Sequence, residues 1–283
     1  MPSKILSLIK FYLSLAIAFS SVAGFVFYSG SLNVHVFSCA AGVFLLACAA
    51  SVLNQYQERE QDALMERTRS RPIPSGTISP ATAAVIAVLS GIAGTGILWA
   101  FSGWQPALLG VANLAWYNAL YTPLKKRSSF AVIIGAVNGA VPPVIGWTAA
   151  GGDIADPQIL FIAFFIFVWQ VPHFWLLLLL HGEDYRKAGF RVATDRIPAP
   201  ARRLILVSWI LATTVSALFL PLFGIVTTRI VVAAIITINV LSLATLAVLL
   251  HPGRKKPGYR AAFIAFNLFM LLVFLLVILD RLG

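Results

Sequence analysis

The chain has 283 residues, of which 59% are hydrophobic and only 11% are charged, and its mean hydropathy is +0.89. Soluble domains carry about 25% charged residues, so this composition excludes a soluble globular protein and indicates a polytopic membrane protein. The net charge of +11 would suggest a nucleic-acid partner in a soluble protein. Here the basic residues lie in short loops, where membrane topology and anionic lipid headgroups account for them, and we expect no nucleic acid.

Nine apolar segments are long enough, or nearly so, to cross the roughly 30 Å of hydrocarbon in a bilayer. We predict spans at residues 11–28, 34–53, 81–101, 106–121, 130–150, 159–180, 204–223, 230–250 and 261–279. No polar stretch between them is long enough for a separate soluble domain, so we expect one membrane-embedded domain over residues 1–283. The fold class predicted from the sequence is therefore all-α, with nine transmembrane helices.

The distribution of Lys and Arg tests this arrangement. If the N-terminus is cytoplasmic, nineteen of the 21 basic residues fall on the inner side, and only Arg229 and Arg281 fall outside. Cytoplasmic loops carry an excess of Lys and Arg, so the asymmetry favours a cytoplasmic N-terminus and a C-terminus outside. The first apolar run is longer than that of a signal peptide, which favours an uncleaved span. Without a targeting extension, we expect the inner (plasma) membrane.

The most polar stretch is residues 50–76, ASVLNQYQEREQDALMERTRSRPIPSG, at the inner end of the second predicted span. Asn54, Glu58 and Asp62 recur there every four residues, which places their side chains close to one face of a helix. Such oxygen-bearing side chains suit Mg²⁺, which prefers carboxylates together with substrate phosphates. A candidate anion site follows at once: Arg67, Arg69 and Arg71. The alternative interpretation is a solvated helix end followed by a topology-setting basic loop.

A second acidic stretch, residues 176–196, follows the sixth predicted span. Its Glu183 and Asp184 could hold a second Mg²⁺ opposite the first group, which suggests two related halves around one cavity that faces the cytoplasm. Lys125 and Lys126 add positive charge on the same side. The alternatives are that the lysines anchor their loop in the cytoplasm, and that Asp184 caps a turn or pairs with a neighbouring basic residue.

Four stretches occur in the same order as in the UbiA-type intramembrane prenyltransferases. NQYQEREQDALMERTRSRPIPSG resembles the family's first aspartate-rich motif, and YNALYTPLKKRS resembles its Y-T-x-x-L-K-R loop. GAVNGAVPPVIGW resembles its glycine-rich helix, and WQVPHFWLLLLLHGEDYRKAG resembles its P-H-F-W and D-Y-x-x-A-G segment. The resemblance covers roughly the first 190 residues. It is greatest to the protohaem IX farnesyltransferase (haem O synthase) branch.

The resemblance implies nine helices around a central cavity, with a Mg²⁺-bound prenyl diphosphate at its cytoplasmic mouth. It implies a Mg²⁺-dependent enzyme that ionises farnesyl diphosphate and transfers the farnesyl group to a vinyl group of haem b. The product would be haem O, for haem A and terminal oxidase biogenesis. The expected metal-binding and catalytic residues are Asn54, Glu58, Asp62 and Asp184, with Glu183 as a further metal ligand. The expected diphosphate-binding residues are Arg67, Arg71, Lys125 and Lys126.

The chain also departs from the family pattern. Leu180 stands where members with aromatic acceptors carry a further aspartate, which favours the haem branch. FRVATD follows Gly189 where the haem branch has a Pro-Met-Leu-Pro-like run, so an aromatic quinone precursor or another lipid acceptor remains the alternative. A transporter or lipid-binding protein is a more distant alternative. Transporters place polar groups near the membrane midplane, whereas this chain gathers its acids at one interface.

His173 lies directly after Pro172 inside the sixth predicted span. Its imidazole is a candidate haem contact, to the iron or to a propionate. Alternatively it hydrogen-bonds a backbone carbonyl that Pro172 leaves free, because proline removes one intrahelical hydrogen bond.

Two further charged residues, Arg59 and Glu60, directly follow Glu58 in the first motif. They lie on other faces of that helix, and we expect them to be loop or pairing residues.

Overall fold

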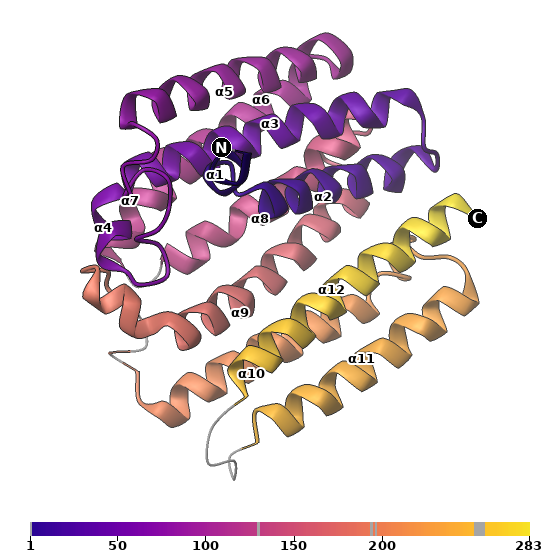
Figure 1. Ribbon diagram of the computed structural model, residues 1–283. Coiled ribbons are helices and arrows are strands. Elements are labelled where there is room, and N and C mark those ends of the chain that lie inside the picture. The colour runs from indigo at the N-terminus through magenta and orange to yellow at the C-terminus, as the bar shows by residue number, and fades with distance from the viewer. Residues whose placement is uncertain (1, 129–130, 193–194, 196, 252–257) are drawn as a thin grey trace.

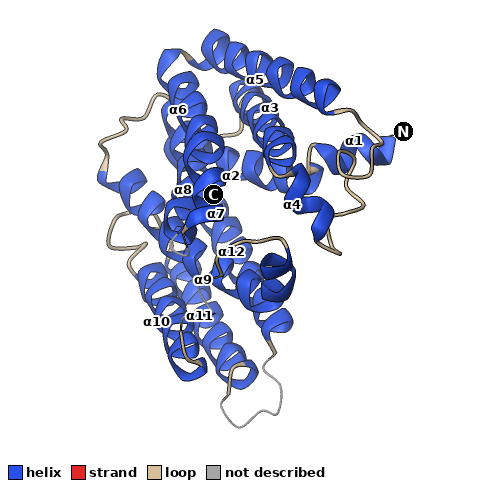
Figure 2. Cartoon of the chain, turned by 90° about the vertical axis from the view of Figure 1, so that its left-hand side faces the viewer, coloured by secondary structure: helices blue, strands red, loops and turns tan. Residues whose placement is uncertain are grey.

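The computed structural model describes residues 2–128, 131–192, 195, 197–251 and 258–283, which form helices and no strand (Figure 1 and Figure 2). The predicted all-α membrane fold is confirmed. Among the described residues, eight helices are long and apolar enough to cross a membrane: α2 (Phe11–Ser29), α3 (Val34–Gln57), α5 (Pro80–Ser102), α8 (Ala131–Ala149), α9 (Pro157–Lys187), α10 (Ala199–Leu218), α11 (Arg229–Leu249) and α12 (Tyr259–Leu282). Residue 130 of the fifth predicted span lies outside the described residues, as do four basic residues counted above: Arg196, Arg254, Lys255 and Lys256.

The fourth predicted span is helical but is divided into two pieces, and a third short helix follows it. α6 (Trp104–Ala115) runs directly into a π-helical turn, η1 (Trp116–Tyr121), and then into α7 (Thr122–Arg127). Pro123 has no N–H to donate to a carbonyl one turn earlier, which favours the wider turn at this place. The predicted count of nine is therefore approximate: eight single helices and one composite segment within the described chain.

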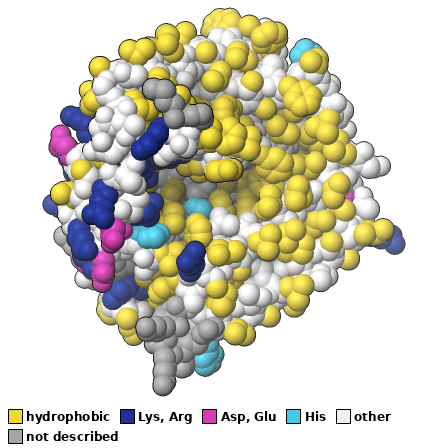
Figure 3. All heavy atoms as spheres, in the orientation of Figure 1, with side chains coloured by type: hydrophobic (Ala, Val, Ile, Leu, Met, Phe, Trp, Pro, Cys, Tyr) yellow, Lys and Arg dark blue, Asp and Glu magenta, His cyan; other side chains and the backbone are white. Residues whose placement is uncertain are grey.

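The helices pack side by side with their charged ends together. Figure 1 shows α4 (Arg59–Leu64), α7 and the last turns of α9 at one end of the bundle. In Figure 3, most of the charged side chains on this face gather at that end, and the rest of the face is largely hydrophobic. The middle of this face is hollowed, and hydrophobic side chains surround the hollow (Figure 3). This arrangement is what a bilayer requires, because charged groups are costly within its hydrocarbon.

Small residues let two of the membrane helices approach closely. A methyl group on Gly146 of α8 would overlap the carbonyl oxygen of Ser21 in α2, and one on Gly24 would overlap the carbonyl oxygen of Pro143. Such backbone contact is typical of membrane helices, which associate by close packing more than by hydrophobic burial. A buried asparagine, Asn118, ties η1 to α3 by donating to the carbonyl oxygen of Ala50 at 3.2 Å. These contacts position α3 beside the composite segment at the charged end.

Candidate active site

The joint between α3 and α4 carries the three predicted ligands of the first motif. Asn54 lies in the last turn of α3, Glu58 at the joint, and Asp62 in α4. The Glu58 N–H donates to the Asn54 carbonyl at 3.0 Å and the Asp62 N–H to the Glu58 carbonyl at 2.7 Å, so the helical pattern continues across the joint. All three residues are at most 2% exposed. The four-residue spacing therefore does place them on one buried face.

Each buried carboxylate is paired with a cation from a different segment. Lys125 of α7 places its Nζ 2.8 Å and 2.9 Å from the two carboxylate oxygens of Glu58. Arg71 donates through Nη1 to both oxygens of Asp62, at 2.9 Å and 2.7 Å. Burial by itself would lower the pKa of Lys125, but the Glu58 carboxylate beside it raises that pKa above its ordinary value. Two residues predicted to bind diphosphate thus lie directly against two predicted metal ligands.

The third predicted ligand, Asn54, also has a basic partner, and this residue is not among the predicted site residues. Lys10, between α1 (Pro2–Leu8) and α2, donates from Nζ to Asn54 Oδ1 at 3.0 Å. Burial lowers the pKa of Lys10 to about 7, and the positive charges of Arg71 and Lys125 add to the effect. No local motif marks Lys10 in the sequence, because its partner lies 44 residues further along the chain.

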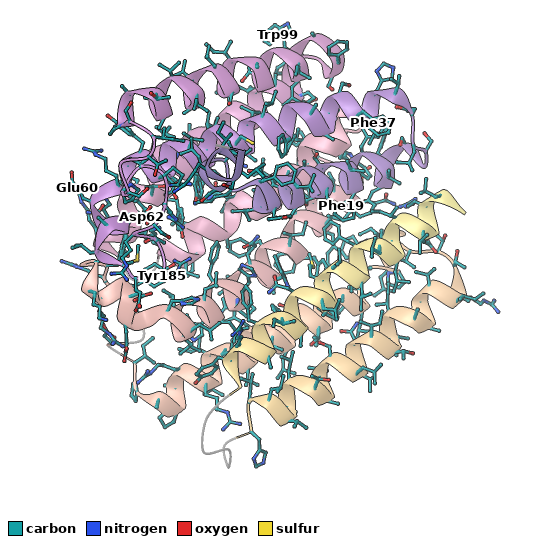
Figure 4. All side chains as sticks on the ribbon, in the orientation of Figure 1. Phe19, Phe37, Glu60, Asp62, Trp99 and Tyr185 are labelled. Atoms are coloured by element: carbon teal, nitrogen blue, oxygen red, sulfur yellow. The ribbon has the colours of Figure 1, made fainter. Side chains whose placement is uncertain are left out.

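The remaining predicted cations lie around the edge of this group. Lys126 donates from Nζ to the carbonyl oxygen of Gln57 at 3.2 Å, at the end of α3. Arg67 is exposed, and it lies close enough to His181 of α9 to act on it electrostatically. As expected, Arg59 and Glu60 form an exposed pair of their own at 3.4 Å. Figure 4 shows Glu60 pointing away from the bundle, whereas Asp62 points inward.

The second acidic stretch continues α9 beyond a kink instead of starting a loop. His181 interrupts the helix with φ −123° and ψ 18°, and the following turns carry an exposed Glu183 and a half-buried Asp184. These turns meet the first motif through a small apolar cluster of Met65, Ala188 and Phe190, with Tyr185 packed against it. The two stretches are therefore neighbours (Figure 4).

The structure does not, however, bring the two acidic stretches into one compact set of ligands. Within the described residues, no three side chains of the types His, Cys, Asp and Glu are close enough together to hold a metal ion. The first motif contributes two carboxylates and one amide, which are hard oxygen donors. This set fits Mg²⁺, which usually binds one or two carboxylates and takes its other ligands from water and substrate phosphates. The second metal site at Glu183 and Asp184 stays a prediction.

An open recess adjoins the Glu58–Lys125 pair, because Lys125 is one of the residues that line it. Its apolar lining includes Phe174, Leu177 and Leu178 of α9, and its polar lining includes Lys125 and Arg191. Because Lys125 belongs both to this recess and to the Glu58 pair, a molecule in the recess would lie next to the first motif.

His173 lies deeper in α9 and has a partner that the sequence analysis did not anticipate. Its Nδ1 is 3.0 Å from Oδ1 of Asn267 in α12, and the Nδ2 of Asn267 donates to the carbonyl oxygen of Phe263 at 2.6 Å. With the amide oriented in this way, Nδ1 carries the proton, and Nε2 keeps a free lone pair. The expected alternative, a bond from His173 to a carbonyl freed by Pro172, is not the contact seen. Aromatic rings surround the imidazole: Trp169, Phe174 and Phe263.

Comparisons with a protein-family model and with curated proteins identify the same kind of protein, a prenyltransferase. Residues 14–273 match the model of the UbiA prenyltransferase family. A protoheme IX farnesyltransferase of Geobacter sulfurreducens is 45% identical over 218 residues, covering 77% of this chain and 80% of the relative. A protoheme IX farnesyltransferase of Oleidesulfovibrio alaskensis is 37% identical over 276 residues, covering 98% of this chain and 95% of the relative.

Solved structures share the fold at low sequence identity. A structure described as a digeranylgeranylglyceryl phosphate synthase matches with a TM-score of 0.79 and 16% identity, covering 99% of this chain and 98% of that one. A UbiA homologue from Archaeoglobus fulgidus bound to DMAPP and Mg²⁺ matches with a TM-score of 0.73 and 14% identity, covering 99% of both chains. At this identity the likeness concerns the fold alone.

Proposed function

Because this chain belongs to the UbiA prenyltransferase family, and is thus an integral membrane prenyltransferase, we propose that it transfers a farnesyl group from farnesyl diphosphate to a vinyl group of haem b. The product is haem O. The observation that carries the proposal is the buried first motif, in which Glu58 and Asp62 lie against Lys125 and Arg71. The names of relatives that cover nearly the whole chain support haem as the acceptor.

In this proposal the first motif binds the metal end of the diphosphate donor. Asn54, Glu58 and Asp62 would hold one Mg²⁺, and Asp184, with Glu183, would hold a second at the end of α9. When bound, Mg²⁺ supplies electrostatic stabilisation of the negative charge on the diphosphate. The diphosphate oxygens are held by four basic side chains: Arg67, Arg71, Lys125 and Lys126.

The chemistry is ionisation followed by capture. The allylic C–O bond of farnesyl diphosphate breaks and the diphosphate leaves with the electron pair, which the surrounding cations stabilise. The vinyl group of haem b then attacks C1 of the farnesyl cation and forms the new C–C bond. Water adds to the resulting cation on the haem substituent and loses a proton, which gives the hydroxyethylfarnesyl group. An apolar cavity around the donor would keep other water from the cation before capture.

His173 is our proposed contact for the acceptor. Its Nε2 lone pair is free because Nδ1 is committed to Asn267, which is the arrangement of a metal-ligating histidine with a fixed tautomer. Phe174, beside His173, also lines the recess that contains Lys125. In this proposal the macrocycle is held at His173 and extends past Phe174 toward the recess and the first motif.

The test uses the purified full chain in detergent with haem b, farnesyl diphosphate and Mg²⁺, and the pigment is analysed by mass spectrometry. We expect a haem O mass that forms only with Mg²⁺ and disappears when EDTA is added. Diphosphate release is measured in the same samples. If diphosphate were released only with an aromatic acceptor, the haem assignment would be wrong while prenyl transfer would stand. If neither acceptor led to diphosphate release, the proposed function would be wrong.

A further inference from the structure

The joint between α1 and α2 has an unusual backbone. Lys10 has φ 47° and ψ 54°, and within the described residues no other non-glycine residue has a positive φ. This left-handed conformation is unfavourable for a residue with a Cβ atom, so it persists only where the surroundings impose it. A glycine would adopt this conformation without the cost of a Cβ atom, so the backbone conformation alone does not explain a lysine at this joint.

The surroundings that impose this joint belong to the first motif. Gln55, which is 0% exposed, donates from Nε2 to the carbonyl oxygens of Ser7 at 3.1 Å and Leu8 at 2.7 Å. These are the last carbonyls of α1, which have no partner within the helix. Gln55 directly follows Asn54 in α3. The same turn of α3 therefore binds the end of α1 through Gln55 and accepts a hydrogen bond from the Lys10 side chain through Asn54.

Lys10 differs from the two neighbouring basic residues of the site in the kind of partner it has. Arg71 and Lys125 each have a carboxylate partner, Asp62 and Glu58 respectively. The oxygen that accepts from Lys10 belongs to a neutral amide, so Lys10, unlike Arg71 and Lys125, has no carboxylate among the partners seen in the described residues. A half-buried group of this kind is stabilised by an added anion, because charges removed from water need a counter-charge.

We infer that Lys10 is a diphosphate-binding residue, which the left-handed joint between α1 and α2 brings to the side-chain oxygen of Asn54. The inference rests on the proposed function, because it requires a diphosphate at the first motif. Lys10 contributes a basic group to the anion site from the N-terminal segment, and Arg71 and Lys125 contribute theirs from two other segments. Lys4, an exposed lysine of the same short helix, serves as the comparison, with Nζ 3.4 Å from Thr77 Oγ1.

The experiment measures binding without turnover. Inorganic diphosphate and Mg²⁺ are titrated into the full-length protein in detergent by calorimetry, and the melting temperature of each variant is recorded. We expect Lys10→Gln to weaken diphosphate binding about tenfold or more, since a charge-assisted hydrogen bond is lost. Lys4→Gln should bind within about twofold of wild type, because an exposed surface charge contributes little.

Lys10→Gly separates the side chain from the backbone. Glycine adopts the left-handed conformation freely, so this variant should melt no lower than wild type and still bind diphosphate about tenfold more weakly. If Lys10→Gln and Lys10→Gly both bound diphosphate within twofold of wild type, the inference would be wrong and the proposed function would stand. If wild type itself bound no Mg²⁺–diphosphate, the proposed function would fail, and the inference with it.

Discussion

At the scale of single residues, the first motif is a set of oxygens whose partners are cations. Asn54, Glu58 and Asp62 come from one face of one segment, and their partners come from three others. Each of the two buried carboxylates has a hydrogen-bonded cation beside it, which offsets part of the cost of removing a charge from water. We propose that this arrangement receives both a metal ion and an anion.

Asp62 is the residue whose charge we expect to be most important for turnover. Asp62→Asn keeps an oxygen for Arg71 but removes the negative charge, so we expect diphosphate release to fall about 100-fold or more. Glu60→Gln, on the outward face of the same short helix, should stay within about twofold of wild type. The measurement is diphosphate release at saturating substrate, with the melting temperature as a check on folding. Equal rates for the two variants would contradict a role for Asp62.

Asn267 is expected to position His173 for haem. Asn267→Leu removes the acceptor for Nδ1–H, and the loss of such a supporting partner typically weakens a metal site about 10- to 100-fold. We therefore expect weaker haem b binding, measured by titration of the Soret band, and His173→Ala should abolish the histidine-ligated spectrum.

The control for Asn267 is Asn239 of α11, which also donates to a carbonyl one turn earlier. Asn239→Leu should leave the haem spectrum unchanged. If Asn267→Leu bound haem with the wild-type affinity and spectrum, the positioning role would be excluded.

At the scale of elements, the close approach of α2 and α8 depends on glycine. Gly146→Ala places a methyl group against the backbone of α2, so we expect a loss of about 1–3 kcal/mol in stability. Gly96 of α5 is the matched control, because a Cβ there meets nothing within 4 Å. Gly96→Ala should be neutral or stabilising by up to about 1 kcal/mol. Thermal unfolding in detergent measures both, and a lower melting temperature for Gly96→Ala than for Gly146→Ala would refute the explanation.

At the scale of the whole molecule, the charged end of the bundle is proposed to face the cytoplasm. The free thiols of Cys39 and Cys48 are buried, and replacing both with alanine provides a background for labelling. In that background, Leu282→Cys should react with a membrane-impermeant maleimide on intact spheroplasts. Lys4→Cys should react only after permeabilisation, as the distribution of Lys and Arg predicts. The reverse pattern would invert the topology and place the first motif on the outer side.

The sequence by itself determined the class of the molecule and its chemical character. Long apolar segments must form helices in a bilayer, because each backbone polar group needs a partner within its own segment. The four-residue spacing of Asn54, Glu58 and Asp62 needed only local helix geometry, so the common face could be predicted. The fourth span was predicted less well, since the π-turn at residues 116–121 depends on local hydrogen bonding that hydropathy does not report.

Only the tertiary structure decided which partners these residues have. Lys10 reaches Asn54 across 44 positions and Lys125 reaches Glu58 across 67, and His173 meets Asn267 across 94. Such pairs depend on how the helices pack, and helix packing follows from shape at contacts such as Gly146 against Ser21. Periodicity within one segment contains no information about a neighbour that is brought close by folding. For that reason the motif could be read from the sequence, while Lys10 and Asn267 could be found only in the folded chain.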